Sequence, residues 1–200
     1  MGRKKVDKRR YNNQAIKEKL AVRAMVYFQN NGFKGITMSK LARDLDMSKT
    51  TIYNHYQSKE ELLEAALEYK LSVISEYETV LENITLPFTE RYRKGMLFFC
   101  VQLYDVSSAL MEEIKEYPEL WAKVERFRLT TFINLKSYYE VGIEIGVFKS
   151  DVNPTLLSLD DQQFLDMLGS KQFREQGIEV LDAYKHHFKT KFSGILNPEN

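Results

Sequence analysis

Apolar residues recur at helical spacing over most of the chain. The first stripe repeats every four residues, and Gly32 follows it as a natural helix stop. Its members are Ile16, Leu20, Ala24 and Phe28. Later stripes cover residues 90–105, 107–116, 118–146, 154–168 and 174–195. No run alternates strictly between apolar and polar residues, as a half-buried strand would. The pattern predicts an all-α fold of about nine helices.

Between the first apolar stripe and the later ones, capping residues mark the starts of three further helices. Thr37 and Ser48 each precede a short apolar-periodic segment, as N-cap residues do. Residues 58–61, Ser-Lys-Glu-Glu, form a capping box that opens a helix continuing to about residue 81. We therefore expect a head at residues 15–60, a connector helix at about 59–81, and a body at 61–200.

The formal net charge of +1 hides a strong asymmetry along the chain. Residues 1–59 carry 14 basic and 4 acidic side chains, a net of +10. Residues 60–200 carry 15 basic and 24 acidic side chains, a net of −9. Such asymmetry indicates a polyanionic partner for the basic half.

Composition excludes several other classes of protein. Apolar residues make up 44% of the chain and charged residues 28%, as in ordinary globular proteins. The single Cys100 permits neither an internal disulfide nor a Cys-based zinc site, which predicts an intracellular, cytoplasmic protein. The uncharged stretch at residues 95–104 is too short to span a bilayer, so no membrane association is expected. The N-terminus also lacks the apolar run of a secretory signal.

Two short helices joined by residues 46–48 have the spacing of a helix-turn-helix. The second, at residues 49–56, is rich in short polar donors, and Ile52 supplies an apolar anchor toward the first. In this motif the second helix enters the DNA major groove and contacts phosphates and base edges.

The head resembles the tetracycline-repressor (TetR) family of bacterial transcription regulators in the order and spacing of its motifs. The resemblance rests on residues 36–43, 48–56 and 58–63, together with Phe28 and residues 31–33 upstream. The resemblance covers roughly residues 14–70. It implies an all-α regulator whose body holds a ligand cavity and whose last helices form a dimer.

The resemblance also implies roles for individual residues of the head. Thr37 and Lys59, at helix N-termini, would bind phosphates, and Tyr53 would contact the DNA backbone. Base readout would fall to Lys49, Thr50 and Thr51, whereas Asn54 and His55 would contact phosphates or sugars. The whole predicted DNA-binding set is Thr37, Ser48, Lys49, Thr50, Thr51, Tyr53, Asn54, His55 and Lys59.

Two positions depart from the family pattern. Asp46 stands in the turn where the family usually has Gly, and we expect it to adopt the left-handed conformation there. Thr50 replaces a frequent Gly and adds bulk where DNA approaches. Residues 1–14 are rich in Arg and Lys, and we expect a flexible arm that adds non-specific attraction to DNA or reaches the minor groove.

The body offers candidates for a ligand pocket and a dimer interface. Its aromatic residues are mostly core, but by the resemblance some would line the cavity. The predicted pocket set is Phe99, Leu103, Trp121, Phe127, Thr131 and Tyr138. The apolar load of the last two helices, at residues 154–168 and 174–195, supports their packing against a second copy as a four-helix bundle. An internal core stripe would give the same pattern.

No other chemistry is indicated. Cys100 lies in an apolar run and is expected to be a buried small hydrophobe. His186 and His187 are adjacent, so their side chains point about 100° apart on a helix, and a solvated or interface face is favoured over a metal site. No catalytic constellation stands out, so neither an enzyme nor a cofactor is predicted.

The sequence therefore predicts a homodimeric regulator, most simply a repressor, that binds a pseudo-palindromic operator and responds to a small molecule. The alternative is a helical small-molecule-binding or protein-interaction module that binds DNA only non-specifically.

Overall fold

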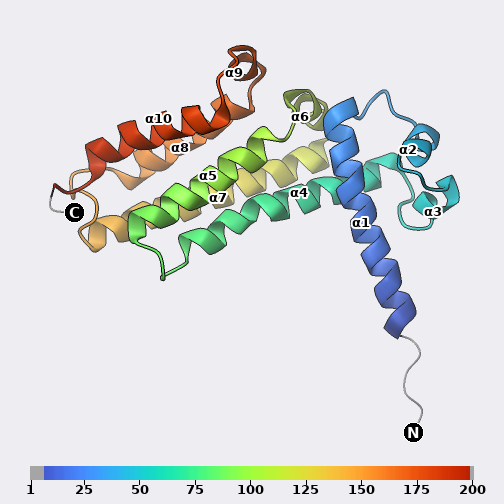
Figure 1. The fold of residues 1–200 in the computed structure, drawn as a ribbon, viewed down its shortest axis with the longest axis horizontal. Coiled ribbons are helices and arrows are strands. Elements are labelled where there is room, and N and C mark those ends of the chain that lie inside the picture. Colours follow the sequence, from blue (N-terminus) through green and yellow to red (C-terminus); the bar gives the residue numbers. More distant parts are fainter. Residues whose placement is uncertain (1–6, 199–200) are drawn as a thin grey trace, which may run out of the picture. The chain divides into compact units, whose positions relative to one another are not determined.

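The computed structural model describes residues 7–198, with side chains from residue 14 onward. Over this range the chain forms ten helices and, in place of strands, a single bridge between Phe148 and Leu196 (Figure 1). The helices are α1 (Asp7–Asn31), α2 (Met38–Asp44), α3 (Lys49–Tyr53), α4 (Lys59–Leu81), α5 (Phe88–Tyr104), α6 (Ser108–Ile114), α7 (Pro118–Glu144), α8 (Pro154–Gly169), α9 (Lys171–Glu175) and α10 (Val180–Ile195). The all-α prediction is confirmed. Within the described range, no helix combines the length and apolar character needed to cross a bilayer.

The chain divides into two units between Ser72 and Val73, inside α4. We call the N-terminal unit the head and the C-terminal unit the body. The sequence-based division ended the head at residue 60, whereas the first turns of α4 pack with the head. Leu62, Leu63 and Ala66 are fully buried there, because they form the apolar face that the capping box introduces.

Helix α1 begins earlier than the apolar stripe indicated. Residues 7–14 of the predicted flexible arm are helical, and residues 1–6 of that arm lie outside the described residues. Neither Gly nor Pro interrupts residues 7–31, so nothing in the sequence stops the helix from extending upstream. The Gln14 side chain donates to the Glu18 carboxylate one turn later, at 2.9 Å.

The head has a core built from all of its helices. Phe28 of α1, Leu41 of α2, Ile52 of α3 and Leu63 of α4 are completely buried. Phe33, in the loop between α1 and α2, meets Phe28 edge to face with ring centroids 5.3 Å apart. This core fixes the short α2 and α3, which are too brief to be stable alone.

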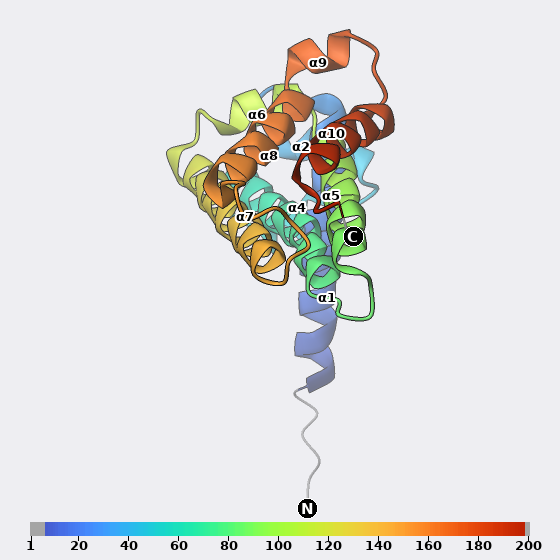
Figure 2. The same ribbon diagram turned by 90° about the vertical axis from the view of Figure 1, so that its left-hand side faces the viewer.

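The body has a second core shared by the end of α4 with α5, α7, α8 and α10. In both views α8 and α10 lie side by side (Figures 1 and 2). Aromatic rings fill much of this core, and its ring contacts include Phe88, Tyr92, Tyr138, Tyr139, Phe148 and Phe192. At Gly142 the rings of Phe148 and Phe88 occupy the space that a Cβ atom would need. A glycine is therefore required at this close approach.

The sequence predicted one last helix at residues 174–195, whereas the chain after residue 170 forms α9 and α10, which accounts for ten helices where about nine were expected. Gly177 has a φ of 66° and interrupts the segment between α9 and α10. Ser170 caps α9, its hydroxyl oxygen accepting from the Phe173 amide at 3.1 Å. The helix that carries the last apolar stripe, α10, therefore begins only at Val180.

The stripe on α10 is mainly an internal one. Tyr184, Phe192 and Ile195 are buried in the body core, and the Tyr184 hydroxyl donates to the Arg93 carbonyl of α5 at 2.6 Å. Leu181 is an exception because its side chain is exposed. Most of the apolar side chains on this helix therefore belong to the core of the body itself.

Candidate nucleic-acid interface

The turn between α2 and α3 is a Schellman motif. The Met47 amide donates to the Ala42 carbonyl at 2.9 Å, and the Asp46 amide donates to the Arg43 carbonyl at 3.1 Å. This geometry needs a left-handed residue, and Asp46 has a φ of 53°. The expected left-handed turn at Asp46 is confirmed, and both hydrogen bonds of the motif form with Asp at this position.

Both predicted N-caps are present. The Thr37 hydroxyl oxygen accepts from the Lys40 amide at 3.2 Å, and the Ser48 hydroxyl oxygen accepts from the Thr51 amide at 2.9 Å. Each cap satisfies an amide that the first helical turn would otherwise leave without a partner. The sequence therefore identified the starts of α2 and α3 correctly.

Helix α3 is shorter than the predicted helix at residues 49–56. It ends at Tyr53, and Asn54 is its C-cap. Tyr56 turns into the head instead: it is buried, and its hydroxyl donates to the Lys17 carbonyl of α1 at 2.9 Å. Burial raises the pKa of Tyr56 to about 12. The Tyr56 amide still donates to the Ile52 carbonyl at 2.9 Å, so the chain after α3 stays close to helical as far as Tyr56. The hydroxyl contact, which no helical pattern contains, ties this end to α1.

Most of the predicted DNA-binding residues lie on the exposed side of the helix-turn-helix. Ile52 is fully buried, so α3 has one anchored face and one open face. Thr51 and His55 are half-buried. The exposed members are Thr37, Ser48, Lys49, Thr50, Tyr53 and Asn54. The Lys49 ammonium lies 5.6 Å from the ring centroid of Tyr53, so a cation and a phenol occupy the same part of this surface.

Two side chains of α1 hold the end of α2, and sequence reasoning missed both. Arg23 donates to the Leu45 carbonyl in the turn, and the Tyr27 hydroxyl donates to the Asp44 carboxylate at 2.6 Å. The bond from Tyr27 holds the pKa of Asp44 below its usual range. Arg23 and Tyr27 are four residues apart on α1, so they share one side of it. In the sequence, only that four-residue spacing could have indicated that the two side chains contact the same neighbouring element.

The capping box of α4 is only partly formed as predicted. The Glu61 amide donates to the Ser58 hydroxyl at 3.0 Å, as expected. The Glu61 carboxylate, however, accepts from the Gln57 amide at 2.6 Å rather than from the amide of Ser58. The box therefore reaches one residue further back and fixes the chain between α3 and α4.

Lys59 differs from the other predicted DNA contacts because its ammonium is already engaged within the head. It donates to the Phe33 carbonyl at 2.9 Å and lies 3.5 Å from the Lys34 carbonyl. It also lies 4.1 Å from the centroid of the Phe33 ring. The side chain is half-buried rather than exposed.

In the body, part of the predicted pocket set comes together. Phe99 and Phe127 meet edge to face with centroids 5.9 Å apart, and buried Thr131 follows Phe127 by one helical turn. Tyr77 of α4, which the sequence did not single out, stacks on Phe99 at 4.9 Å. These residues join α4, α5 and α7 within the body core.

The rest of the predicted pocket set lies elsewhere. Tyr138 stacks on Phe88 at 4.3 Å, and its hydroxyl donates to the Phe88 carbonyl at 2.5 Å. Trp121 is half-buried, with the Lys115 ammonium 5.6 Å from its ring. Leu103 is half-buried at the edge of the core. Helical spacing alone could not show which of these side chains turn toward one another.

Two buried hydroxyls near Phe99 lack a well-aligned hydrogen-bond partner among the described residues. They belong to Tyr77 and Thr131, and the Thr131 and Asn134 side chains lie near the Tyr77 hydroxyl. Burial raises the pKa of Tyr77 to about 12. A buried hydroxyl without a good hydrogen-bond partner lowers the stability of the fold. These two hydroxyls are therefore candidates for hydrogen bonds to a bound molecule.

A second polar group in the body centres on Asp161 of α8, which is fully buried. Its carboxylate accepts from the Tyr92 hydroxyl at 2.5 Å, the Tyr139 hydroxyl at 2.6 Å and the Lys191 ammonium at 2.6 Å. His187 lies 3.2 Å away. Burial opposes the ionisation of Asp161, but the His187 and Lys191 contacts outweigh it and lower its pKa.

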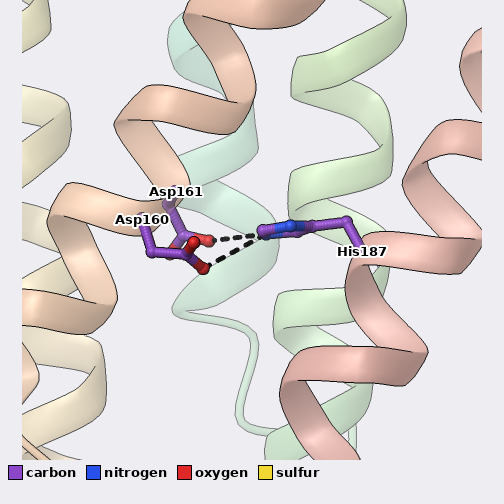
Figure 3. Close-up of side chains that lie close together, drawn as sticks. All are labelled: Asp160, Asp161 and His187. Atoms are coloured by element: carbon purple, nitrogen blue, oxygen red, sulfur yellow. Dashed lines mark hydrogen bonds and ion pairs between the residues drawn. The ribbon is translucent and has the colours of Figure 1, made fainter.

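The sequence favoured a solvated or interface face for the two histidines, but the His187 side chain is only 14% exposed and so is not solvated. It reaches from α10 toward Asp160 and Asp161 (Figure 3) and stacks on Phe164 with centroids 4.0 Å apart. His186 is exposed, as the 100° separation of adjacent helical residues requires. The pattern could not indicate which of the two histidines turns inward.

Asp160, Asp161 and His187 present ligand atoms within 4.8 Å of one another, as a metal site would. The Lys191 ammonium, however, lies 2.6 Å from the Asp161 carboxylate and 3.2 Å from that of Asp160. A divalent cation bound to these oxygens would lie beside a positive charge. The arrangement is that of a buried ion pair with its own cation.

Comparison with known proteins finds a family match within the head. Residues 22–66 match the family model described as bacterial regulatory proteins, tetR family. The matched segment runs from α1 through α2 and α3 into α4, and so contains the whole helix-turn-helix.

Relatives of similar length extend the likeness to the rest of the chain. The biofilm operon icaADBC HTH-type negative transcriptional regulator IcaR of Staphylococcus epidermidis is 24% identical, over 91% of this chain and 97% of its own. A TetR transcriptional regulator from Chloroflexus aurantiacus has a similar fold, with a TM-score of 0.73 and 18% identity over 93% of this chain and 98% of its own. The TetR-family regulator PfmR from Thermus thermophilus gives 0.64 and 24%, over 84% and 94%.

Proposed function

We propose that this chain, a member of the tetR family of bacterial regulatory proteins, is a repressor that binds a pseudo-palindromic operator as a homodimer and is released by a small molecule. The observation that carries the proposal is the open face of α3. Its exposed polar side chains stand beside a buried Ile52 anchor, between a capped start and a Schellman turn. Such a face suits phosphates and base edges in the major groove.

Charge supports DNA as the partner of this face. Residues 1–59 carry a net charge of +10, and the acidic residues lie mainly in the rest of the chain. The resemblance gives Lys49 to base readout, but its ammonium lies beside the Tyr53 ring, the proposed backbone contact, so we assign both side chains to phosphates. Thr50 and Thr51 would approach the base edges. Thr37, Ser48, Asn54 and His55 complete the proposed contact set. A protein that binds DNA would act in the cytoplasm of a bacterial cell.

Surface features of α8 and α10 support a homodimer through these helices. Leu156, Leu159 and Met167 of α8 are between 42% and 64% exposed. The exposed side of α10 carries Lys185 and Lys189, and α8 carries the exposed carboxylates of Asp160 and Asp166. In a two-fold interface each α8 would pack on the α10 of the second copy, so that acidic and basic helices meet.

The response to a small molecule is supported by the body core around Tyr77 and Thr131. Their hydroxyls are buried among Phe99 and Phe127 without well-aligned partners. A mainly apolar ligand with a hydrogen-bonding group would satisfy them. Because Tyr77 belongs to α4, such a ligand would act on the connector helix. It would change DNA binding only if its affinity differed between the two arrangements of that helix.

The relatives favour repression over activation. The Staphylococcus epidermidis protein that aligns over nearly the whole chain is named a negative transcriptional regulator. A dimer that covers two successive major grooves would also block access to the DNA beneath it.

Selection of bound fragments from a random DNA pool tests the proposal. The full chain should enrich a palindromic consensus whose half-sites are about one helical turn, 34 Å, apart or a multiple of it. Lys49→Glu on α3 should abolish the enrichment. Lys94→Glu, the same charge change at an exposed position on α5, is the matched control and should retain it.

Absence of a consensus would contradict the proposal. The chain would then fit the second function, a helical small-molecule-binding or protein-interaction module whose basic head binds DNA only non-specifically. Loss of the consensus in the Lys94→Glu control would instead show that total charge, and not the face of α3, selects the sequence.

A further inference from the structure

Lys59 occupies an electrostatically unfavourable position. It is the first residue of α4, where the aligned peptide dipoles place positive potential and disfavour a cation. The next two residues, Glu60 and Glu61, have the charge that this position favours. A lysine here needs a compensating partner.

Backbone carbonyls supply that partner. The Lys59 ammonium donates to the Phe33 carbonyl at 2.9 Å and lies 3.5 Å from the carbonyl of Lys34. The Phe33 ring lies beneath it, with its centroid 4.1 Å from the ammonium nitrogen. Two carbonyl dipoles and an aromatic face together offset the repulsion of the helix terminus.

These carbonyls belong to the turn that leads into α2. The Phe33 carbonyl also accepts from the Ile36 amide at 3.3 Å, which closes the turn. Thr37 follows directly and caps α2. Phe33 itself is completely buried against Phe28, so the turn is fixed on its inner side by packing and at its carbonyls by Lys59.

We propose that Lys59 is a positioning residue for DNA binding, whose ammonium fixes the turn before Thr37 instead of binding a phosphate. This inference rests on the proposed DNA binding of the head. Lys59 joins the start of α4 to the start of α2, and so sets where the Thr37 end of the helix-turn-helix stands relative to α4. The lysines with exposed side chains, such as Lys49, remain the ones that meet phosphates.

The two roles differ in their dependence on salt. Each phosphate neutralised by a lysine adds about 0.9 to the slope of log K against log salt concentration, so two heads would contribute about 1.8. A positioning residue adds nothing to this slope, because it releases no counterion. It affects affinity at every salt concentration equally.

The experiment measures binding of the full chain to a mixed-sequence 30-base-pair duplex over a range of salt concentrations. Lys59→Met keeps the stem over Phe33 but removes the donor, and should weaken binding by about tenfold with an unchanged slope. Lys59→Arg should restore affinity, because a guanidinium can donate to both carbonyls. Lys49→Met is the matched control and should flatten the slope.

A Lys59→Met slope that flattens as much as that of Lys49→Met would overturn the positioning role and establish a phosphate contact. Unchanged affinity in Lys59→Met would overturn both roles. If Lys59→Met does not fold, Lys59→Gln retains a neutral donor and its slope decides in the same way. If the unmodified chain binds no duplex, the proposed function fails first and the positioning role fails with it.

Discussion

At the scale of single residues, Asp161 has the clearest energetic role. It is a fully buried carboxylate that contacts Tyr92, Tyr139, His187 and Lys191, and so links α8 to α5, α7 and α10. The Lys191 side chain is itself only 4% exposed. Removing one partner of such a pair leaves the other as an uncompensated buried charge, which is far more costly than losing a surface ion pair.

Asp161→Asn should therefore destabilise the body by about 3 to 5 kcal/mol, as measured by urea unfolding at pH 7. The matched control is Asp166→Asn. Asp166 lies on the same helix and forms an exposed ion pair with Arg128. Its loss should cost about 0 to 1 kcal/mol. Equal effects of the two substitutions would show that the buried group adds nothing beyond an ordinary surface pair.

The same carboxylate predicts a dependence of stability on pH. Its contacts lower the pKa of Asp161 in the folded protein. The ionised group therefore stabilises the fold above the ordinary carboxyl pKa of about 3.9, and this contribution disappears as the pH falls through the lower folded value. Urea titrations between pH 5 and pH 2 should show a steeper loss for the unmodified protein than for Asp161→Asn. Parallel curves would contradict this assignment.

At the scale of elements, the turn between α2 and α3 stores local strain at one residue. Asp46 adopts a φ of 53°, which side chains other than Gly enter at some cost. The hydrogen bonds of the Schellman motif nevertheless hold it there. The turn therefore depends on its surroundings more than on the preference of its central residue.

Asp46→Gly should stabilise the head by roughly 0.5 to 1 kcal/mol, since Gly adopts this conformation without strain. Thermal unfolding should register the gain as a higher midpoint. Lys40→Gly, in the exposed interior of α2, is the control and should cost about 1 kcal/mol. A loss of stability in Asp46→Gly would mean that the Asp side chain contributes a contact worth more than the strain it brings.

At the scale of the whole molecule, the position of a dimer interface is set by the exposed apolar residues that a second copy of the chain would bury. Leu159 of α8 is 42% exposed, and Ile133 of α7 is 54% exposed. Only Leu159 belongs to the last two long helices. The two positions therefore test the location of the interface with the same chemical change.

Sedimentation of the full chain should give a dimer at micromolar concentration. Leu159→Glu should convert it to a monomer, because a carboxylate would be buried without a partner in the bundle. Ile133→Glu should leave the dimer intact. The reverse result would move the interface to α7, and a monomeric unmodified chain would refute the homodimer altogether.

Local patterns were sufficient for the all-α class and for the starts of most helices. Apolar spacing, the caps Thr37 and Ser48, and the left-handed turn at Asp46 depend on residues within a few positions of one another. Interactions of this range can be deduced from a single sequence. The exposed face of α3 followed in the same way, once Ile52 was assigned as its anchor.

Contacts between distant residues were decided only by the tertiary structure. The Tyr56 side chain is buried toward α1, where it donates to the Lys17 carbonyl, and Lys59 turns back to Phe33 instead of pointing outward. His187 turns inward because Asp161 lies on the neighbouring helix. The sequence alone thus determined most of the helical segments and which face of the head is polar. The direction of each long polar side chain depended on partners that the packing of helices brings near, and no local pattern contains that information.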